Sequence, residues 1–354
     1  MNKSKRCYVD VHVLQTVPPS CVNRDDTGSP KTAIYGGTTR ARVSSQAWKK
    51  ASRAMFSDFF DDAQLGERTK KIVAKVAEEI AALDANVDAE KLAIKALEQA
   101  GLKIKDAAKG TDALFFISTA QAKALATLAV EGCKEKKTYH NALKENPSVD
   151  IALFGRMVAD DPSLNYDAAA QVAHSISTHT VHNEYDYFTA VDDRAPEDNA
   201  GAGHLGTVEF NSATLYRYAT VNITELTKTL GKEAPHTARA FAEAFIRSMP
   251  TGKQNTFANR TLPDCVYITM RADQPVNLCG AFEKPVISRG GYAEPSARRL
   301  EEYAGKIYAN FAEAPQKAWA TGDLEIDAVI LPLTAVLDEL ETYLKQLIDD
   351  CEVE

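Results

Sequence analysis

The hydrophobic pattern at the start of the chain has a period of two. Residues 7–15, CYVDVHVLQ, place Val9, Val11 and Val13 on one face and Tyr8, Asp10, His12 and Leu14 on the other. Successive side chains of an extended strand point to opposite faces, so this alternation predicts a β-strand. The following residues are rich in Pro, Gly, Ser, Asn and Asp and predict a loop.

The pattern then changes to spacings of three and four, which predict a helix with one inner stripe: Trp48, Ala51, Ser52, Met55 and Phe59. We expect this helix to begin at Ser44 or Ser45, because either hydroxyl can cap the first turn. Residues 62 to about 146 are rich in Ala, Glu, Lys and Leu and predict several amphipathic helices. A short buried strand is expected within 111–130, and the whole block is interpreted as a helical insertion.

The rest of the chain predicts mixed α/β structure. We expect a buried strand or strand-like turn at 150–158, a helix at 166–178 with Ala169, Val172, Ala173 and Ile176 inward, and a loop at 192–206. Further elements are a strand at 213–223, a helix at 237–249, a strand at 264–270 and helices near 295–313 and 334–350. Strand–helix–strand units interrupted by a helical block indicate a ferredoxin-like α/β core with excursions.

Composition is that of a globular protein. The 354 residues are 45% hydrophobic and 25% charged, and the chain is long enough for two domains. The basic N-terminus lacks the apolar region of a signal peptide, and no apolar run is long enough to span a membrane, so we expect a cytoplasmic protein. The six cysteines form no CxxC pair and are expected to be free thiols.

Charge is distributed unevenly. The net charge is −8, yet residues 27–57 contain no Asp or Glu and hold six cations: Lys31, Arg40, Arg42, Lys49, Lys50 and Arg53. Lys49 and Arg53 are spaced to share a helix face, where two like charges repel unless an anion lies across them. Gly36 and Gly37 would let backbone N–H groups approach an anion. This spacing of cations suits contacts to a phosphodiester backbone. A basic helix face that only contacts solvent explains it equally well.

Candidate catalytic and metal-binding groups are sparse. Asp25 and Asp26 form a carboxylate pair that can hold Mg²⁺, although an Asx turn or an ion pair with Arg24 is the more common arrangement. His174, His179 and His182 have a weak metal-ligand spacing. Because the chain has no GxGxxG, Walker-type, GxSxG or HExxH motif, we expect no cofactor, no metal and no catalysis.

Two further segments have a composition suited to nucleic acid. Tyr185, Tyr187 and Phe188 precede the loop at 192–206, and aromatic side chains on a projecting segment can stack on bases. Burial in the core is an equally good explanation for them. Lys134, Lys136, Lys137 and Lys144 end the helical block, where they are either a solvated helix face or a polyanion contact.

Several motifs in order resemble one family: PSCVNRDD, AIYGGTTRARVSSQAWKKASR, DIALFGRM, AHSISTHTV, FTAVDD, HLGTVEFNSATLYRYA and GKQNTFA. The chain resembles the CasC backbone subunit (the Cas seven family of the RAMP superfamily) of the type I-E CRISPR Cascade complex. The resemblance implies an α+β fold with a ferredoxin-like (RRM-like) palm, helical fingers and a projecting thumb. It places palm at 1–60 and 149–354, fingers at 61–148 and thumb at about 178–212.

The resemblance also implies a function and its residues. Copies of the chain would oligomerise along a CRISPR guide RNA, contact other Cascade subunits and support target DNA recognition by base pairing. RNA contacts are expected from Arg24, Gln46, Lys49 and Arg53, with Lys31, Arg40, Arg42 and Ser44 of the same window, and from Met157, Tyr187, Phe188 and Leu205. Lys134, Lys136 and Lys137 would contact target DNA. The alternative is a metal-dependent RNase like the backbone subunits of type III complexes, using Asp25 or Asp26.

Overall fold

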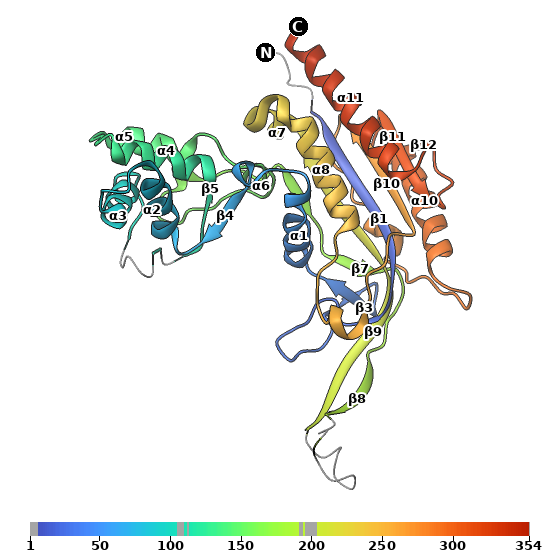
Figure 1. The fold of residues 1–354 in the computed structure, drawn as a ribbon. Coiled ribbons are helices and arrows are strands. Elements are labelled where there is room, and N and C mark those ends of the chain that lie inside the picture. The colour runs from blue at the N-terminus through green and yellow to red at the C-terminus, as the bar shows by residue number, and fades with distance from the viewer. Residues whose placement is uncertain (1–5, 105–109, 112, 191–193, 195–203, 354) are drawn as a thin grey trace. The chain divides into compact units, whose positions relative to one another are not determined.

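The computed structural model describes residues 6–104, 110–111, 113–190, 194 and 204–353 (Figure 1). The chain forms two compact units, both assembled from separate stretches of sequence. Unit 1 comprises 1–54, 172–220 and 241–354, and unit 2 comprises 55–171 and 221–240. Unit 2 therefore extends beyond the predicted fingers block at both ends and also takes in 221–240. The fold is α+β, with one large mixed sheet and many helices.

Unit 1 is built on the large sheet, whose strand order is β12-β11-β10-β1-β9-β7-β3-β2, with β8 also paired to β9. Neighbouring pairs are antiparallel in β1–β10, β10–β11, β7–β9, β3–β7 and β2–β3, and parallel in β11–β12. The strands are β1 (Tyr8–Ser20), β2 (Thr32–Tyr35), β3 (Thr38–Val43), β7 (Ser175–Ser177), β8 (Glu184–Ala190), β9 (His204–Asn222), β10 (Cys265–Arg271), β11 (Lys317–Gly322) and β12 (Val329–Ile330). The predicted strands at 7–15, 213–223 and 264–270 are therefore confirmed.

Helices cover this sheet through apolar stripes. Leu300 and Ala304 of α10 share a buried cluster with Leu14 of β1 and Tyr267 of β10. The helices of unit 1 are α1 (Ser45–Ala54), the second half of α8 (Ala234–Arg247), α9 (Gln254–Phe257), α10 (Ala293–Asn310) and α11 (Leu333–Val353). The helices expected near 237–249, 295–313 and 334–350 are all present, so the period of 3.6 is reliable where the stripe is long.

Asp10 is a buried carboxylate in the core of unit 1. Its Oδ1 accepts a hydrogen bond from the Tyr218 hydroxyl at 3.0 Å, and its Oδ2 accepts one from the Val276 N–H at 2.9 Å. Burial raises the pKa of Asp10 from 3.8 to about 6, and these hydrogen bonds and the charge of Arg271 only partly oppose it. The native state therefore binds the Asp10 proton more tightly than the unfolded chain does. Stability from this group is complete below pH 3.8 and is lost as the pH rises through 6.

We expect Asp10→Asn to remove this dependence. From pH 4 to pH 7 the wild type should lose about 2 kcal/mol of unfolding free energy through Asp10, and the variant should lose none of it. The neighbouring His12, whose pKa burial lowers to about 3, contributes with the opposite sign in both proteins and largely cancels in the comparison. Urea unfolding followed by circular dichroism at both pH values measures the difference. A wild-type-minus-variant difference that is constant with pH would contradict the assignment.

Unit 2 is mainly helical. Its helices are α2 (Ile72–Leu83), α3 (Ala89–Gln99), α4 (Thr119–Val130), α5 (Lys136–Lys144), α6 (Val149–Phe154), α7 (Ile223–Leu230) and the first half of α8, beside the two-stranded sheet of β4 (Gly66–Thr69) and β5 (Phe115–Ser118). Short 3₁₀ turns lie at Phe56–Asp58, Asp62–Gln64, Pro162–Leu164 and Gly231–Glu233. One apolar core joins α2, α3, α4 and α5, with Ile80, Leu97, Leu125 and Leu143 fully buried. The amphipathic helices and the short strand predicted for this block are thus confirmed.

Two predicted elements are wrong. The segment predicted as a buried strand or strand-like turn at 150–158 begins as helix α6, which Gly155 ends at φ +75°. A short apolar run does not distinguish a buried strand from a buried helix. The segment predicted as a helix at 166–178 instead holds β6 (Ala170–Val172) and β7. Its alanines suggested helix, but Ser175 and Ser177 are needed in a strand, where they bond the Trp48 indole N–H and the Ala41 N–H.

Across the described ranges, with their gaps at 105–109, 112, 191–193 and 195–203, no helix has both the length and the apolar character needed to cross a bilayer.

Candidate nucleic-acid interface

Helix α1 carries the centre of the basic window and has a well-anchored inner face. Ser44 is its N-cap, as predicted, because the Ser44 Oγ accepts the Ala47 N–H at 3.3 Å. Trp48 is fully buried, its indole N–H donates to Ser175 Oγ at 2.9 Å, and the Arg217 guanidinium lies 3.8 Å from its ring centroid. Ser52 is buried one turn later. These contacts determine which side of the helix faces outward.

The outward side of α1 is basic. At 100° per residue, Gln46, Lys50 and Arg53 fall on the side of the helix away from Trp48 and Ser52, and Lys49 falls at the edge of that side. Gln46 and Lys50 are exposed, and Lys49 and Arg53 are half-buried. The structure therefore brings three predicted RNA contacts together on one face. Lys50, which belongs to the basic window but was not predicted to contact RNA, lies on the same face.

The loop before β2 presents Arg24. It is closed by a backbone bridge between Arg24 and Pro30, and Asn23 Oδ1 accepts the Ser44 N–H at 2.9 Å, which ties the loop to the start of α1. Asp25 stabilises the loop internally: its Oδ1 accepts hydrogen bonds from the Thr27 hydroxyl at 2.7 Å and the Ser29 N–H at 3.0 Å. The Thr27 hydroxyl is the main reason why the pKa of Asp25 is lowered. Arg24 itself is exposed.

Lys31 and Arg42 form a second cationic group in unit 1. The Arg42 N–H donates to the Lys31 carbonyl at 2.9 Å, and Arg42 Nη1 lies 3.1 Å from His174 Nδ1. Burial first, and then the charges of Arg42 and Lys31, lower the pKa of His174. The lowered pKa favours the neutral form of His174, and both cations remain half-buried at the surface.

Three predictions for the basic window need correction. Arg40 is fully buried, and its guanidinium donates to the carbonyls of Ser177 at 2.9 Å and Phe282 at 2.9 Å, so it stabilises the core and does not face a ligand. Gly36 does not hold an open anion site either. A Cβ on Gly36 would lie 1.6 Å from the Glu283 carbonyl oxygen, so the glycine is required for backbone packing in the β2–β3 turn. Ser44 is also buried in its cap position.

Lys253 is a candidate that the sequence did not single out. It lies in the motif GKQNTFA and has a left-handed backbone, φ +48°, which is rare for a residue other than glycine. A Cβ on Gly252 would lie 2.1 Å from the Val22 carbonyl oxygen, so this segment packs on the Arg24 loop. Burial raises the pKa of the Cys21 thiol while the charges of Arg24 and Lys253 lower it, which places both cations near Cys21.

The predicted thumb is an antiparallel hairpin of β8 and β9, which extends away from the rest of unit 1 (Figure 1). Tyr185 and Tyr187 lie on one face of β8 and are 64% and 72% exposed, which excludes a core role for them. Phe188 lies on the other face, where its ring covers Gly206 of β9. Leu205 pairs with Thr189 through the backbone, but its side chain lies outside the described residues, as do 195–203 of the predicted loop.

Unit 2 carries the remaining candidates. Met157 is 85% exposed, in the segment after α6. Lys134, Lys136 and Lys137 are exposed at the start of α5, and Lys144 is exposed at its end. Tyr139 and Leu143 of α5 are buried, whereas these lysines remain exposed.

The three histidines do not converge on one site. His174 contacts Arg42, as above, and His182 is exposed. His179 is buried, accepts the Thr214 N–H through Nε2 at 3.1 Å and stacks on Tyr292. Where residues are described, no group of three or more His, Cys, Asp or Glu side chains could hold a metal ion.

Comparison with solved structures finds similar chains. One is a chain titled "CRISPR RNA-guided surveillance complex, pre-nicking", with 32% sequence identity and a TM-score of 0.82, where the match covers 95% of this chain and 100% of that chain. Another is titled "CRISPR RNA-guided surveillance complex", with 29% identity and a TM-score of 0.64 over 95% of this chain and 99% of that one. A search of curated proteins gave no match.

The sequence model of one protein family spans nearly the whole chain. It is described as CT1975-like protein and matches residues 9–349, which include both units and every candidate contact named above. This chain belongs to the CT1975-like protein family.

Proposed function

We propose that the chain is a guide RNA-binding backbone subunit of a type I-E CRISPR surveillance complex and that it has no catalytic activity of its own. The observation that carries the proposal is a match over 95% of the chain, at 32% identity, to a subunit of an RNA-guided surveillance complex. The basic face of α1 supports it, because this acidic protein places Lys49, Lys50 and Arg53 there without a neighbouring Asp or Glu in the helix.

RNA binding rests on spaced cations in unit 1. Gln46, Lys49 and Arg53 on α1, with Arg24 on the adjoining loop, offer amide and charged donors to phosphate oxygens. Lys31 and Arg42 offer further charged donors of the same kind. Contacts of this kind hold a backbone without reading its sequence, so the sequence would be read by base pairing between guide and target.

Assembly and target recognition complete the proposal. A ferredoxin-like palm is supported by the core strand order β10-β1-β9-β7, in which the strands stand fourth, first, third and second along the chain, with α1 and α8 in the connections. Unit 2 would be the fingers and the β8–β9 hairpin the thumb. Copies would line up along one guide RNA in the cytoplasm together with other Cascade subunits. Tyr187, Phe188 and Met157 would contact guide bases, and Lys134, Lys136 and Lys137 would contact target DNA.

The alternative is a metal-dependent RNase that uses Asp25 or Asp26. Three hydrogen bonds already occupy the Asp25 Oδ1, from the Thr27 N–H, the Thr27 hydroxyl and the Ser29 N–H. This is the arrangement of an Asx-type loop, which gives the carboxylate a structural role. The local geometry therefore favours the binding function.

One preparation tests both functions. When the chain is expressed with partner subunits and a CRISPR transcript, we expect it to purify with RNA of guide sequence, identified by sequencing. Incubated with Mg²⁺ or Mn²⁺ and an RNA complementary to the guide, the complex should leave that RNA intact. Cleavage at regular intervals that Asp25→Ala or Asp26→Ala abolishes would establish the RNase instead, and a complex without guide RNA would overturn the proposed function.

A further inference from the structure

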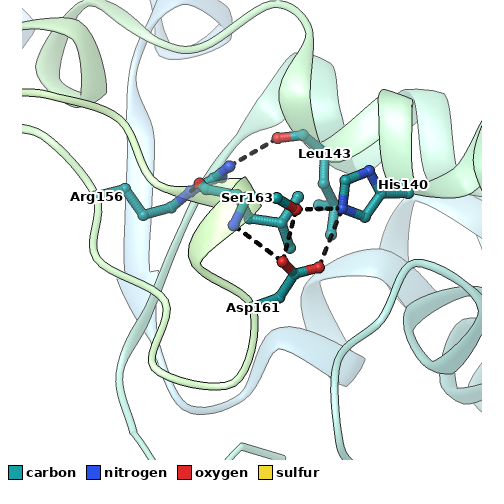
Figure 2. A network of polar contacts seen from close by, with 6 residues as sticks. His140, Leu143, Arg156, Asp161 and Ser163 are labelled. Atoms are coloured by element: carbon teal, nitrogen blue, oxygen red, sulfur yellow. Dashed lines mark hydrogen bonds and ion pairs between the residues drawn. The ribbon is translucent and has the colours of Figure 1, made fainter.

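Two polar contacts join α5 to the segment 155–166 within unit 2 (Figure 2). The first involves His140 on the side of α5: its Nε2 lies 3.0 Å from Asp161 Oδ2 and 2.9 Å from Ser163 Oγ. The Ser163 hydroxyl donates to Asp161 Oδ1 at 2.6 Å, so its oxygen is left to accept. Both neighbours of Nε2 are then acceptors, which assigns the ring proton to Nε2.

This cluster is not a hydrolase triad, although it contains Ser, His and Asp. In a triad the carboxylate and the hydroxyl contact opposite ring nitrogens, and the hydroxyl donates to the histidine. Here both contact Nε2, and the hydroxyl donates to the carboxylate (Figure 2). The Ser163 hydroxyl is also the main reason why the pKa of Asp161 is lowered. The carboxylate is therefore a stable ionised acceptor for His140.

The second contact is made by Arg156, which is 4% exposed. Its Nη2 donates to the Leu143 carbonyl in the last turn of α5 at 2.8 Å, and its Nη1 donates to Gln121 Oε1 of α4 at 3.1 Å. Burial lowers the pKa of Arg156 to about 10, so it remains charged at neutral pH. A buried guanidinium whose donors are spread over several elements holds those elements in one arrangement.

Met157 follows Arg156, but its side chain is apolar and exposed, whereas that of Arg156 is charged and buried. The backbones of Arg156 and Tyr166 exchange hydrogen bonds of 3.0 and 2.9 Å, and the Val158 N–H donates to Asn165 Oδ1 at 2.6 Å. Val158 is buried, whereas Met157 is 85% exposed. An apolar side chain held outward between two anchored neighbours is placed to contact a flat apolar surface such as a base.

We propose that the His140–Asp161 and Arg156–Leu143 contacts form a brace that couples the lysine face of α5 to Met157. Lys136 and Lys137 are exposed in the first turn of α5, and His140 and Leu143, one and two turns later, connect the helix to the Met157 segment. A polyanion bound along α5 then restrains the Met157 segment as well. His140, Asp161 and Arg156 are positioning residues in this scheme, and the inference rests on the proposed function for the identity of the polyanion.

The test is amide hydrogen exchange of the full chain with and without a duplex DNA of arbitrary sequence. We expect the DNA to slow exchange in 155–166 by about fivefold or more, the lower end of typical coupling between sites. In His140→Leu, which loses the donor, the DNA should still bind but should no longer slow exchange there. In His140→Gln, which keeps an N–H donor, the slowing should return. His140 is partly exposed, so both variants are expected to fold, and circular dichroism checks this.

The outcomes separate the two claims. Slowing that persists in His140→Leu would mean that DNA covers 155–166 directly, and it would overturn the brace while leaving the α5 contact intact. If DNA binds the wild type without slowing amide exchange in 155–166, the brace is likewise overturned and the α5 contact is left intact. Absence of salt-sensitive DNA binding, or binding that Lys136→Ala with Lys137→Ala does not weaken, would overturn the α5 contact itself and the brace with it.

Discussion

Changing Lys49 and Arg53 to Glu is expected to lower guide RNA affinity by about 100-fold or more. Each cation would lose a charge-assisted hydrogen bond to phosphate, worth about 1.5–3 kcal/mol, and every 1.4 kcal/mol is a factor of ten. Loss of two phosphate contacts should also reduce the slope of log affinity against log salt by about 1.4. Filter binding over a salt series measures both effects. The helix itself should persist, because Trp48 and Ser52 anchor its other face.

The matched control is Lys91→Glu with Lys95→Glu. These lysines are exposed on α3, have the same spacing of four residues and undergo the same change of charge. If RNA binding depends only on net charge, the control will lose as much affinity as the α1 variant. Equal losses in the two variants, or RNA loading by the α1 variant at the wild-type level, would remove α1 from the interface.

Changing Tyr187 to Ala should weaken target DNA pairing more than guide binding. Stacking of a base on an aromatic side chain is worth about 1–3 kcal/mol, or 5- to 150-fold, and the phosphate contacts of α1 would still hold the guide. If the ring displaces a guide base, a mismatch at that base costs little in the wild type. In Tyr187→Ala the same mismatch should cost as much as its neighbours. Guide retention and target affinity must be measured separately on the assembled complex.

Tyr185→Ala is the control for this prediction. Tyr185 lies on the same face of β8, two residues away, and is similarly exposed. Phe188→Ala is a poorer probe than the sequence suggested, because the Phe188 ring covers Gly206 and its loss would weaken the hairpin. Equal effects of the two tyrosine changes on target pairing would argue against a specific role for Tyr187. Aggregation of Tyr187→Ala would instead indicate a structural role.

The sequence predicts this fold best where a pattern is long. The alternation at the start of β1 and the stripes of α8, α10 and α11 give the correct element types, because many residues report the same period. The predictions were wrong for the short apolar segment that forms α6 and for the alanine-rich segment around β7, because neither segment is long enough to show a clear period. In each, the deciding contacts are tertiary: Ser175 is in a strand because Trp48 needs its hydroxyl.

The candidate site was predictable in part. Spacing on a helix is local, so Lys49 and Arg53 could be placed on one outward face of α1 from the sequence. Arg40 could not be placed, because its burial depends on the carbonyls of Ser177 and Phe282, which are distant in the chain. Lys253 was missed for a similar reason, since only folding brings it to the Arg24 loop.

The brace in unit 2 shows the same limit. Nothing local to Arg156 distinguishes it from an exposed cation, and the motif DIALFGRM pointed to Met157 alone. The buried position of Arg156 is determined by the Leu143 carbonyl and by Gln121, which belong to two helices earlier in the chain.

The central claim is that copies of this chain assemble along one guide RNA, and the mass of the complex as a function of guide length tests it most directly. Complexes are prepared with three guides whose spacers differ in length, and native mass spectrometry gives the number of copies in each. The account predicts that the copy number rises by whole chains as the guide lengthens, with all other subunits unchanged. A copy number that is independent of guide length, or assembly in the same number without RNA, would contradict it.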